Sequence, residues 1–286
     1  MGRLFYAILK PMQKYVVLDK KVGQTPLQCA DIYKETHPEL IGVPMTYAGR
    51  LDPMASGKLL ILLGDECKKQ SEYHNLDKQY EFEVLLGVNS DTGDVLGLLN
   101  PSPRAALGLG GVREIADICH SLTGEVELPY PHYSAKTVRG KPLHTWALEE
   151  KIDEIEIPTK KSIIHKIKCV EVYTRTRAEV YAYASTKIET IPPVTELRKA
   201  IGNDFRRVDV RKDWNEFEKN GSSTDLFYIA KITCTVSSGT YMRTLAEVIG
   251  KKLDTNGLAY SIHRSKIGRY RNIPKTSLGL WIKRYT

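Results

Sequence analysis

Hydrophobic and polar residues alternate over several segments of the chain, which is the pattern of a half-buried β-strand. The clearest alternation spans residues 226–236 and puts six apolar residues on one predicted face: Leu226, Tyr228, Ala230, Ile232, Cys234 and Val236. Residues 79–86 alternate in the same way, with Tyr80, Phe82 and Val84 on one face. The same pattern, or a short apolar run, predicts further strands over residues 14–18, 59–63, 166–173 and 178–184.

Apolar residues at helical spacing predict helices over residues 25–36, 112–122, 143–151 and 241–253. The last of these has Met242, Leu245, Val248 and Ile249 as its apolar stripe, and Thr240 or Ser238 is expected to cap its first turn. Residues 101–111 and 128–141 are rich in residues that break regular structure, so we interpret both as loops. Strands and helices follow one another without a regular β-α-β repeat, which predicts an α+β fold.

The 286 residues are interpreted as one domain, residues 1–286. Residues 188–225 are polar and highly charged, and we interpret them as an insertion with one or two short helices. No stretch approaches 18 apolar residues, which excludes a membrane-spanning helix, and the first residues lack the apolar block of a signal peptide. We therefore expect a cytoplasmic protein without a membrane partner, and a monomer is the default expectation.

The charge of the chain points to a polyanionic partner. Lys and Arg number 42 against 34 Asp and Glu, and the net charge is +8. No acidic residue follows Asp254, whereas basic and aromatic residues alternate to the end: Tyr260, Arg264, Lys266, Arg269, Tyr270, Arg271, Lys275, Trp281, Lys283, Arg284 and Tyr285. Such a mixture suits RNA phosphates and unstacked bases. A merely solvated basic C-terminal tail is the alternative interpretation.

Metal and disulfide chemistry is not indicated. The five cysteines are scattered, without a C-x-x-C pair, and the seven histidines show no metal-ligand spacing. We expect neither a disulfide framework nor a structural metal.

Two segments carry candidate chemistry. Asp52 lies in a Gly- and Pro-rich loop, and Pro53 favours an extended backbone that can present its carboxylate to a pocket. Arg50 is close enough in sequence to keep that carboxylate ionised. Arg243 lies in the first turn of a predicted helix, where the helix dipole disfavours a cation unless an anion is near. An ordinary turn aspartate and an exposed helix arginine are the alternative interpretations.

Together with other motifs, these segments resemble the TruB family of tRNA pseudouridine synthases. The motifs follow one another in the family's order: Gly49–Gly57 around Asp52, Lys78–Tyr80, Ser90–Asp94, Pro131–Ala135, Ser238–Ala246 and Ile262–Ser265. They cover roughly residues 15–270. The resemblance implies the family's catalytic core, an α+β fold with a mixed, largely antiparallel sheet flanked by helices and a central RNA-binding cleft.

The resemblance also implies the chemistry. It describes a cofactor-free isomerase in which Asp52 is the catalytic aspartate that attacks the target nucleotide. Tyr80 matches the tyrosine that stacks on the base, Arg243 the arginine that pairs with the aspartate, and Ile262 the apolar residue beneath the uracil. The uridine must leave its stack to reach this site. The implied substrate is RNA, with the T-loop uridine (position 55) in the T-arm of tRNA as the expected target.

Further residues are implied in substrate binding: Lys20, Tyr47, Arg50, Tyr133, Ser134, Lys136 and Arg264. Tyr47 stands where the family usually has a histidine, and a tyrosine can stack on a base but cannot become cationic. The family's bacterial members usually continue into a PUA domain, and we expect none here. The basic tail or the segment 188–225 is a hypothetical replacement for its RNA contacts.

Other functions stay open from the sequence alone. Arg50, Leu51 and Asp52 also occur in rRNA-type pseudouridine synthases, and a guide-RNA-dependent enzyme would share the chemistry. A catalytically inactive RNA-binding or folding module is the non-enzymatic alternative.

Overall fold

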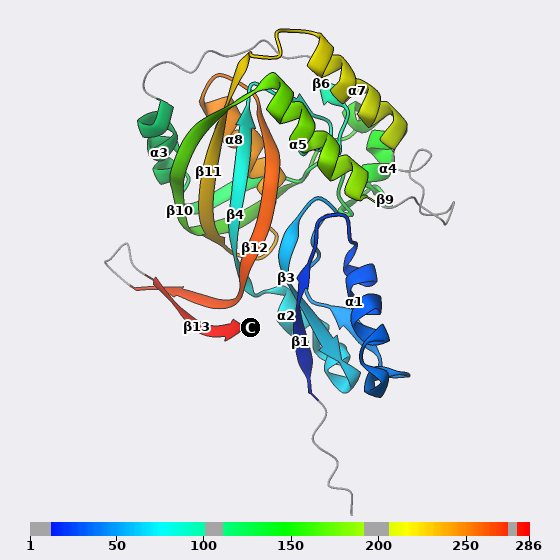
Figure 1. Ribbon diagram of the computed structural model, residues 1–286. Coiled ribbons are helices and arrows are strands. Elements are labelled where there is room, and N and C mark those ends of the chain that lie inside the picture. Colours follow the sequence, from blue (N-terminus) through cyan, green and yellow to red (C-terminus); the bar gives the residue numbers. More distant parts are fainter. Residues whose placement is uncertain (1–12, 101–110, 192–205, 274–278) are drawn as a thin grey trace, which may run out of the picture.

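One large sheet organises most of the described residues, which are 13–100, 111–191, 206–273 and 279–286 of a computed structural model (Figure 1). Its nine strands are β1 (Tyr15–Lys20), β2 (Met45–Tyr47), β3 (Ser56–Leu63), β4 (Asp77–Leu86), β7 (Gly124–Pro129), β10 (Thr159–Thr176), β11 (Leu226–Val236), β12 (Gly257–Asn272) and β13 (Gly279–Tyr285). Their order is β1-β3-β12-β4-β11-β10-β7, with β2 paired to β3 and β13 to β12. The predicted α+β fold with a largely antiparallel sheet is confirmed.

Helices flank the sheet. They are α1 (Pro26–Glu35), α2 (Gln70–His74), α3 (Gly111–Ser121), α4 (Leu143–Leu148), α5 (Arg177–Thr190), α7 (Arg207–Lys219) and α8 (Met242–Lys252). Short 3₁₀ turns are η1 (Pro38–Leu40), η2 (Gly64–Lys69) and η3 (Ile152–Glu154). Two small strand pairs complete the described chain: β5 (Asn89–Ser90) with β6 (Leu99–Asn100), and β8 (Thr137–Val138) with β9 (Lys141–Pro142). The four predicted helices correspond to α1, α3, α4 and α8. No helix in these ranges is both long and apolar enough to cross a membrane.

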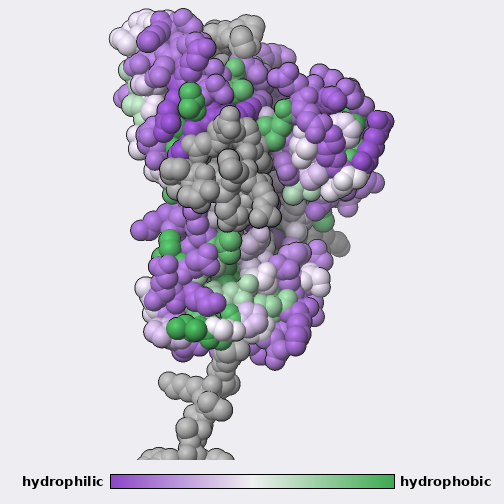
Figure 2. Space-filling model, turned by 90° about the vertical axis from the view of Figure 1, so that its right-hand side faces the viewer, coloured by the Kyte–Doolittle hydropathy of each residue, from purple (hydrophilic) through white to green (hydrophobic). Residues whose placement is uncertain are grey.

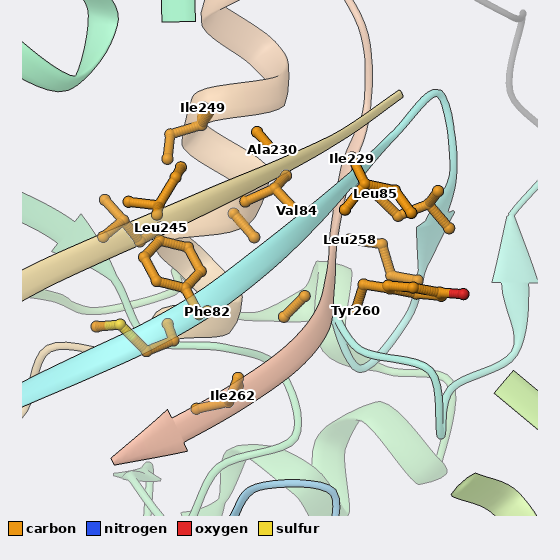
Figure 3. Close-up of a cluster of buried hydrophobic side chains, with 14 of the residues drawn as sticks. Phe82, Val84, Leu85, Ile229, Ala230, Leu245, Ile249, Leu258, Tyr260 and Ile262 are labelled. Atoms are coloured by element: carbon orange, nitrogen blue, oxygen red, sulfur yellow. The ribbon is translucent and has the colours of Figure 1, made fainter. Parts of the chain in front are cut away.

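The main core lies between α8 and the middle of the sheet (Figure 3). Ile232 of β11 pairs with Phe82 of β4, so alternate side chains of both strands point to the same face. Leu245 and Ile249 of α8 pack against that face, and all four of these side chains are at most 1% exposed. Burying side chains of this size contributes roughly 1.5–3 kcal/mol each. The predicted faces of residues 79–86 and 241–253 therefore form the core.

The face predicted for residues 226–236 is correct at one end of β11 and wrong at the other. Ile232 and Cys234 are buried as expected, whereas Leu226 is 49% exposed and Tyr228 37%. Phe227, which the alternation placed outside, is buried against Phe217 of α7, with ring centroids 5.3 Å apart. The reason is that α5 and α7 cover the opposite face of the sheet at this end, so both faces of β11 are buried in different places.

Residues 178–184, predicted as a strand, are helical and belong to α5. The side chain of Thr176 accepts a hydrogen bond from the backbone N–H of Glu179, and the Glu179 side chain accepts one from the backbone N–H of Thr176. This capping box starts the helix and outweighs the alternation. The cap predicted for α8 is also wrong: its N-cap is Tyr241, and Thr240 instead donates to the Ser237 carbonyl.

The two helices α5 and α7 form an excursion from the sheet. Thr176 at the end of β10 pairs with Leu226 at the start of β11, so the chain leaves the sheet between these two neighbouring strands. We call the described residues between them, 177–191 and 206–225, the α5–α7 excursion. The sequence of the excursion is polar, but its Trp214 is fully buried. The indole N–H of Trp214 donates to the Val95 carbonyl at 3.0 Å. The short helix predicted within residues 188–225 exists as α7; the status of this segment as an insertion stays a prediction.

Strand β12 makes two further contacts that complete the sheet, one with β3 and one with β13. β3 and β12 run parallel where Gly57 pairs with Arg264, and this contact joins the N-terminal strands to the rest of the sheet. Beyond it, the end of β12 and β13 form a hairpin that projects from the body in Figure 1. We call this hairpin, residues 267–273 and 279–286, the C-terminal arm. Of the loop predicted at 101–111, residues 101–110 lie outside the described residues.

Candidate active site

Asp52 lies in the loop between β2 and β3, and its carboxylate faces the first turn of α8. Its Oδ2 is 2.8 Å from Nε of Arg243. The Asp52 side chain is 35% exposed, whereas that of Arg243 is 6% exposed. The two neighbours Leu51 and Met54 are buried, and the backbone N–H of Ala55 donates to the Asp52 carbonyl at 3.0 Å. The loop is therefore anchored on both sides of a carboxylate that solvent can still reach.

Arg243 is the centre of the site. Beside the ion pair with Asp52, its Nη1 donates to the Thr92 carbonyl at 2.8 Å and its Nη2 to the Tyr133 carbonyl at 3.3 Å. A second carboxylate oxygen, Oδ2 of Asp94, lies 3.8 Å from Nε. Burial opposes the charge of Arg243, but Asp52 and Asp94 raise its pKa above the ordinary value. The guanidinium therefore stays charged and has a fixed orientation.

Asp94 is a site residue for which the sequence alone indicated no individual role. It ends the Ser90–Asp94 turn, is 4% exposed, and accepts a hydrogen bond from the Thr92 hydroxyl at 2.8 Å. Burial raises the pKa of Asp94, and the charge of Arg243 opposes that shift. The motif containing Asp94 was visible in the sequence, but only the fold brings its carboxylate beside Arg243.

Tyr80 and Ile262 line the same region from the sheet. Tyr80 lies on β4 and Ile262 on β12, and both strands are neighbours. The side chains are 8% and 5% exposed. Burial raises the pKa of the Tyr80 phenol, which stays protonated at neutral pH. The fold thus brings Asp52 beside Arg243 and within electrostatic reach of Tyr80, and Ile262 belongs to the same buried cluster as Tyr80.

Lys20 and Arg264, which the resemblance implied in substrate binding, are each only 1% exposed and support the Asp52 loop. The Lys20 ammonium donates to the carbonyls of Gln24 at 2.7 Å and Pro53 at 3.4 Å, and burial lowers its pKa to about 8. Arg264 donates to the carbonyls of Lys58, Arg50 and Gly49 at 2.7, 3.3 and 3.1 Å. Their direct access to a substrate is blocked in this structure.

The other implied substrate-binding residues lie nearer the surface. Arg50 is exposed and donates to the Tyr47 hydroxyl at 3.2 Å. Lys136 is exposed, with its ammonium 5.4 Å from the centre of the Tyr130 ring. Tyr133 is half-buried, and burial together with Asp91 raises its pKa to about 12. Ser134 is 7% exposed, and its hydroxyl has no hydrogen-bond partner within the described residues.

Metal-ligating side chains do not gather at this site. Within the described ranges, no group of three or more His, Cys, Asp or Glu residues is placed to hold a metal ion. The site combines a solvent-accessible carboxylate, a buried arginine and a buried phenol. Such a set supports covalent catalysis by a carboxylate whose ionised form is stabilised by a neighbouring cation.

Known proteins have sequences similar to this one. Residues 43–190 match the model of the "TruB family pseudouridylate synthase (N terminal domain)". The chain is 30% identical over 257 residues to tRNA pseudouridine synthase B of Caldicellulosiruptor saccharolyticus, covering 90% of this chain and 68% of that protein. It is 28% identical to tRNA pseudouridine synthase 4 of Saccharomyces cerevisiae, covering 74% and 57% respectively. The chain belongs to the TruB family of pseudouridylate synthases.

The family predicted from the motifs is therefore confirmed, and with it the enzyme class, an isomerase that forms pseudouridine. Among solved structures, the chain is similar to one in a Cbf5–Nop10–Gar1 complex, with a TM-score of 0.48 and 15% identity. That similarity covers 89% of this chain and 49% of the other, so this chain spans about half of its length.

Proposed function

We propose that this enzyme converts uridine to pseudouridine in tRNA, with the T-loop uridine at position 55 as its target. The observation that carries the proposal is the Asp52–Arg243 ion pair, 2.8 Å long, beside Tyr80. The names of the relatives, tRNA pseudouridine synthases, support tRNA as the substrate.

Asp52 begins the reaction on the flipped uridine. Its carboxylate either forms a bond to ribose C1′ or promotes loss of the C2′ proton to give a glycal; in both routes the C1′–N1 bond breaks and uracil takes the electron pair. The uracil turns and C5 bonds to C1′. Formation of the C5–C1′ bond displaces the carboxylate or, in the glycal route, is accompanied by return of the proton to C2′; C5 then loses its proton, and N1 gains one. No atom is added or lost overall, so no cofactor is needed.

The other side chains have distinct roles in this proposal. Arg243 pairs with Asp52 and directs it at the sugar, and the buried Asp94 holds Arg243 in place. Tyr80, whose phenol stays protonated, stacks on the uracil, and in the glycal route the Asp52 carboxylate accepts the ribose proton. Ile262 supports the base from below. Lys20 and Arg264 keep the Asp52 loop in position rather than contact RNA.

RNA contacts outside the pocket are proposed for two surfaces. The loop that contains Tyr133, Ser134 and Lys136 contacts Arg243 through the Tyr133 carbonyl, and Arg50, two residues before Asp52, donates to the Tyr47 hydroxyl. The C-terminal arm contains no acidic residue. It exposes four basic side chains: Arg269, Arg271, Lys283 and Arg284. We assign the arm to the phosphate backbone of the substrate.

The test is tritium release from tRNA transcripts labelled at uridine C5, using the protein alone. Release should depend on Asp52, so that Asp52→Asn loses at least about 1,000-fold in rate while still binding tRNA. A transcript with cytidine in place of the T-loop uridine should release nothing above the background of Asp52→Asn.

Other outcomes assign other functions. Release that requires Asp52 but persists with the cytidine transcript would move the target to another RNA position. Binding without release would favour a guide-dependent enzyme, another RNA substrate or an inactive RNA-binding module. Protein-only release on a bare T-arm hairpin would exclude the guide-dependent alternative.

A further inference from the structure

Arg206 precedes α7 in a backbone conformation that L-residues rarely adopt. Its φ and ψ are 57° and 26°, in the left-handed region, and no side chain caps the helix there. A non-glycine residue in this region costs on the order of 1 kcal/mol and persists where surrounding contacts hold it. The side chain of Arg206 is 15% exposed, so those contacts come from the protein.

The Arg206 guanidinium holds two segments of the active site at once. Its Nη1 donates to Oδ2 of Asp91 at 2.5 Å, and its Cζ lies 4.6 Å from the centre of the Tyr133 ring. Asp91 in turn accepts the backbone N–H of Leu98 on Oδ1 at 2.9 Å, which fixes the carboxylate. Arg206 therefore links the Ser90–Asp94 turn to the Tyr133 loop.

These two segments are the ones that orient Arg243. Its Nη1 donates to the carbonyl of Thr92, next to Asp91, and its Nη2 donates to the carbonyl of Tyr133. Arg206 contacts the side chains of Asp91 and Tyr133. The carbonyl groups that accept hydrogen bonds from Arg243 belong to Tyr133 itself and to Thr92, the neighbour of Asp91. A change at Arg206 would thus reach Asp52 through Arg243 without direct contact.

The other side of the α5–α7 excursion also reaches the Asp52 loop. Near the end of α5, the carbonyl oxygen of Thr190 would lie 2.2 Å from a Cβ on Gly23, so only glycine fits there. The backbone N–H of Gly23 donates to the Pro53 carbonyl at 2.9 Å, directly after Asp52. The excursion therefore contacts the segments that hold Arg243 and also the segment that holds the Asp52 loop.

We propose that Arg206 is a positioning residue: it clamps Asp91 to Tyr133 and so fixes the orientation of Arg243 toward Asp52. The inference rests on the proposed function for its kinetic consequences. The α5–α7 excursion is then part of the catalytic apparatus rather than a passive surface addition. The competing role, a phosphate contact to RNA by Arg206, would make no demand on Asp91.

The test compares Arg206→Met and Arg206→Lys with Arg211→Met. Arg211 is a matched control on the same helix, because its ion pair with Glu189 joins side chains that are 38% and 61% exposed. In tritium release, Arg206→Met should lower kcat at least tenfold with KM changed less than threefold, since misplacement of a catalytic group acts on the chemical step. Arg206→Lys should also be impaired, because an ammonium has neither the planar fork nor the stacking surface. Arg211→Met should match wild type.

A double-mutant cycle tests the route of the effect. If Arg206 acts through Asp91, Arg206→Met combined with Asp91→Asn should lose no more kcat than the more damaging single variant. Additive losses would overturn the proposal. So would a main effect on KM and on the salt dependence of tRNA binding, which would identify a phosphate contact.

A second measurement does not depend on activity. Hydrogen exchange of the backbone amides around Thr92 and Tyr133 should speed up in Arg206→Met and stay unchanged in Arg211→Met. Unchanged exchange in both variants would overturn the clamp. If wild type releases no tritium but the exchange result holds, the proposed reaction fails while the clamp stands.

Discussion

At the residue scale, buried cations determine how the site is built. Arg243 sits in the first turn of α8, where the helix dipole is unfavourable to it, and two carboxylates with two carbonyls compensate. Lys20 and Arg264 donate to backbone carbonyls of the Asp52 loop, and the buried Lys78 donates to the carbonyls of His74 and Leu76 just before β4. Burial lowers the pKa of both Lys20 and Lys78, so the charge of these two ammonium groups depends on pH.

Lys78 provides a measurable case. It is 5% exposed, and burial, with Arg264 nearby, lowers its pKa from 10.5 to about 7. Between pH 7 and 10.5 the unfolded chain holds this proton and the folded chain does not, so the Lys78 contribution to stability improves as pH rises in that window. The free energy of unfolding of wild type minus that of Lys78→Met should rise by up to about 1.4 kcal/mol per pH unit between about pH 7 and 9.

Urea unfolding of both proteins at about pH 6, 7.5 and 9 measures this difference. Lys20 and Lys187, whose burial lowers the pKa of each to about 8, are present in both proteins and cancel. Parallel stability profiles would mean that the Lys78 ammonium stays charged in the folded protein.

At the element scale, the structure divides what the sequence could predict from what it could not. Strand β4 and helix α8 follow their periodicity because each packs one face against one core. Residues 178–184 also alternate, but the capping box at Thr176 and Glu179 makes them helical. The family motifs indicated Asp52, Tyr80 and Arg243, whereas Arg206 lies beside Asp91 only because the α5–α7 excursion folds back over the sheet. No local pattern reports such a contact.

The C-terminal arm is the element whose proposed role is easiest to separate from catalysis. Its base is fixed, because the backbone N–H of Tyr270 donates to Asp77 and Tyr285 is buried against Tyr15 and Tyr73. Changing its four exposed cations (Arg269, Arg271, Lys283 and Arg284) to glutamine should weaken tRNA binding. The slope of log affinity against log salt should become shallower by about 0.7–0.9 for each phosphate that the arm no longer neutralises.

Filter binding at several salt concentrations gives that slope. A control variant changes four exposed lysines on α7 and the last turn of α8 to glutamine: Lys212, Lys219, Lys251 and Lys252. It has the same net charge as the arm variant. An equal loss of tRNA affinity in both variants would therefore show that the overall charge, and not the arm itself, accounts for the effect. The arm variant should keep its kcat at saturating tRNA.

At the scale of the whole molecule, the N-terminal strands join the rest of the sheet through the short parallel contact between β3 and β12. Gly57 makes this contact possible. It has a φ of +104°, and a Cβ there would lie 2.3 Å from the backbone oxygen of Arg264. Since Asp52 belongs to one part and Arg243 to the other, this contact also sets the geometry of the ion pair.

Gly57→Ala should therefore lower the free energy of unfolding by about 3 kcal/mol or more, because overpacking adds to the cost of a positive φ. Gly42→Ala is the matched control: its φ is +78°, but nothing lies within 4 Å of its added Cβ. It should cost only about 1 kcal/mol. Chemical unfolding measures both, and similar losses would show that the close approach to Arg264 relaxes at little cost.

The buried position of Trp214 has a consequence for the fluorescence of the protein. Its indole is fully buried and donates a hydrogen bond to the carbonyl of Val95, the residue that follows Asp94. The chain has three tryptophans, and the other two lie elsewhere: Trp146 on α4 and Trp281 in the C-terminal arm. Trp146 and Trp281 are partly exposed, so the emission of the fully buried Trp214 should differ from theirs. The side of the molecule seen in Figure 2 is mainly hydrophilic. With Trp146 and Trp281 replaced by phenylalanine, the fluorescence of Trp214 alone would report changes next to the Ser90–Asp94 turn in real time while RNA binds.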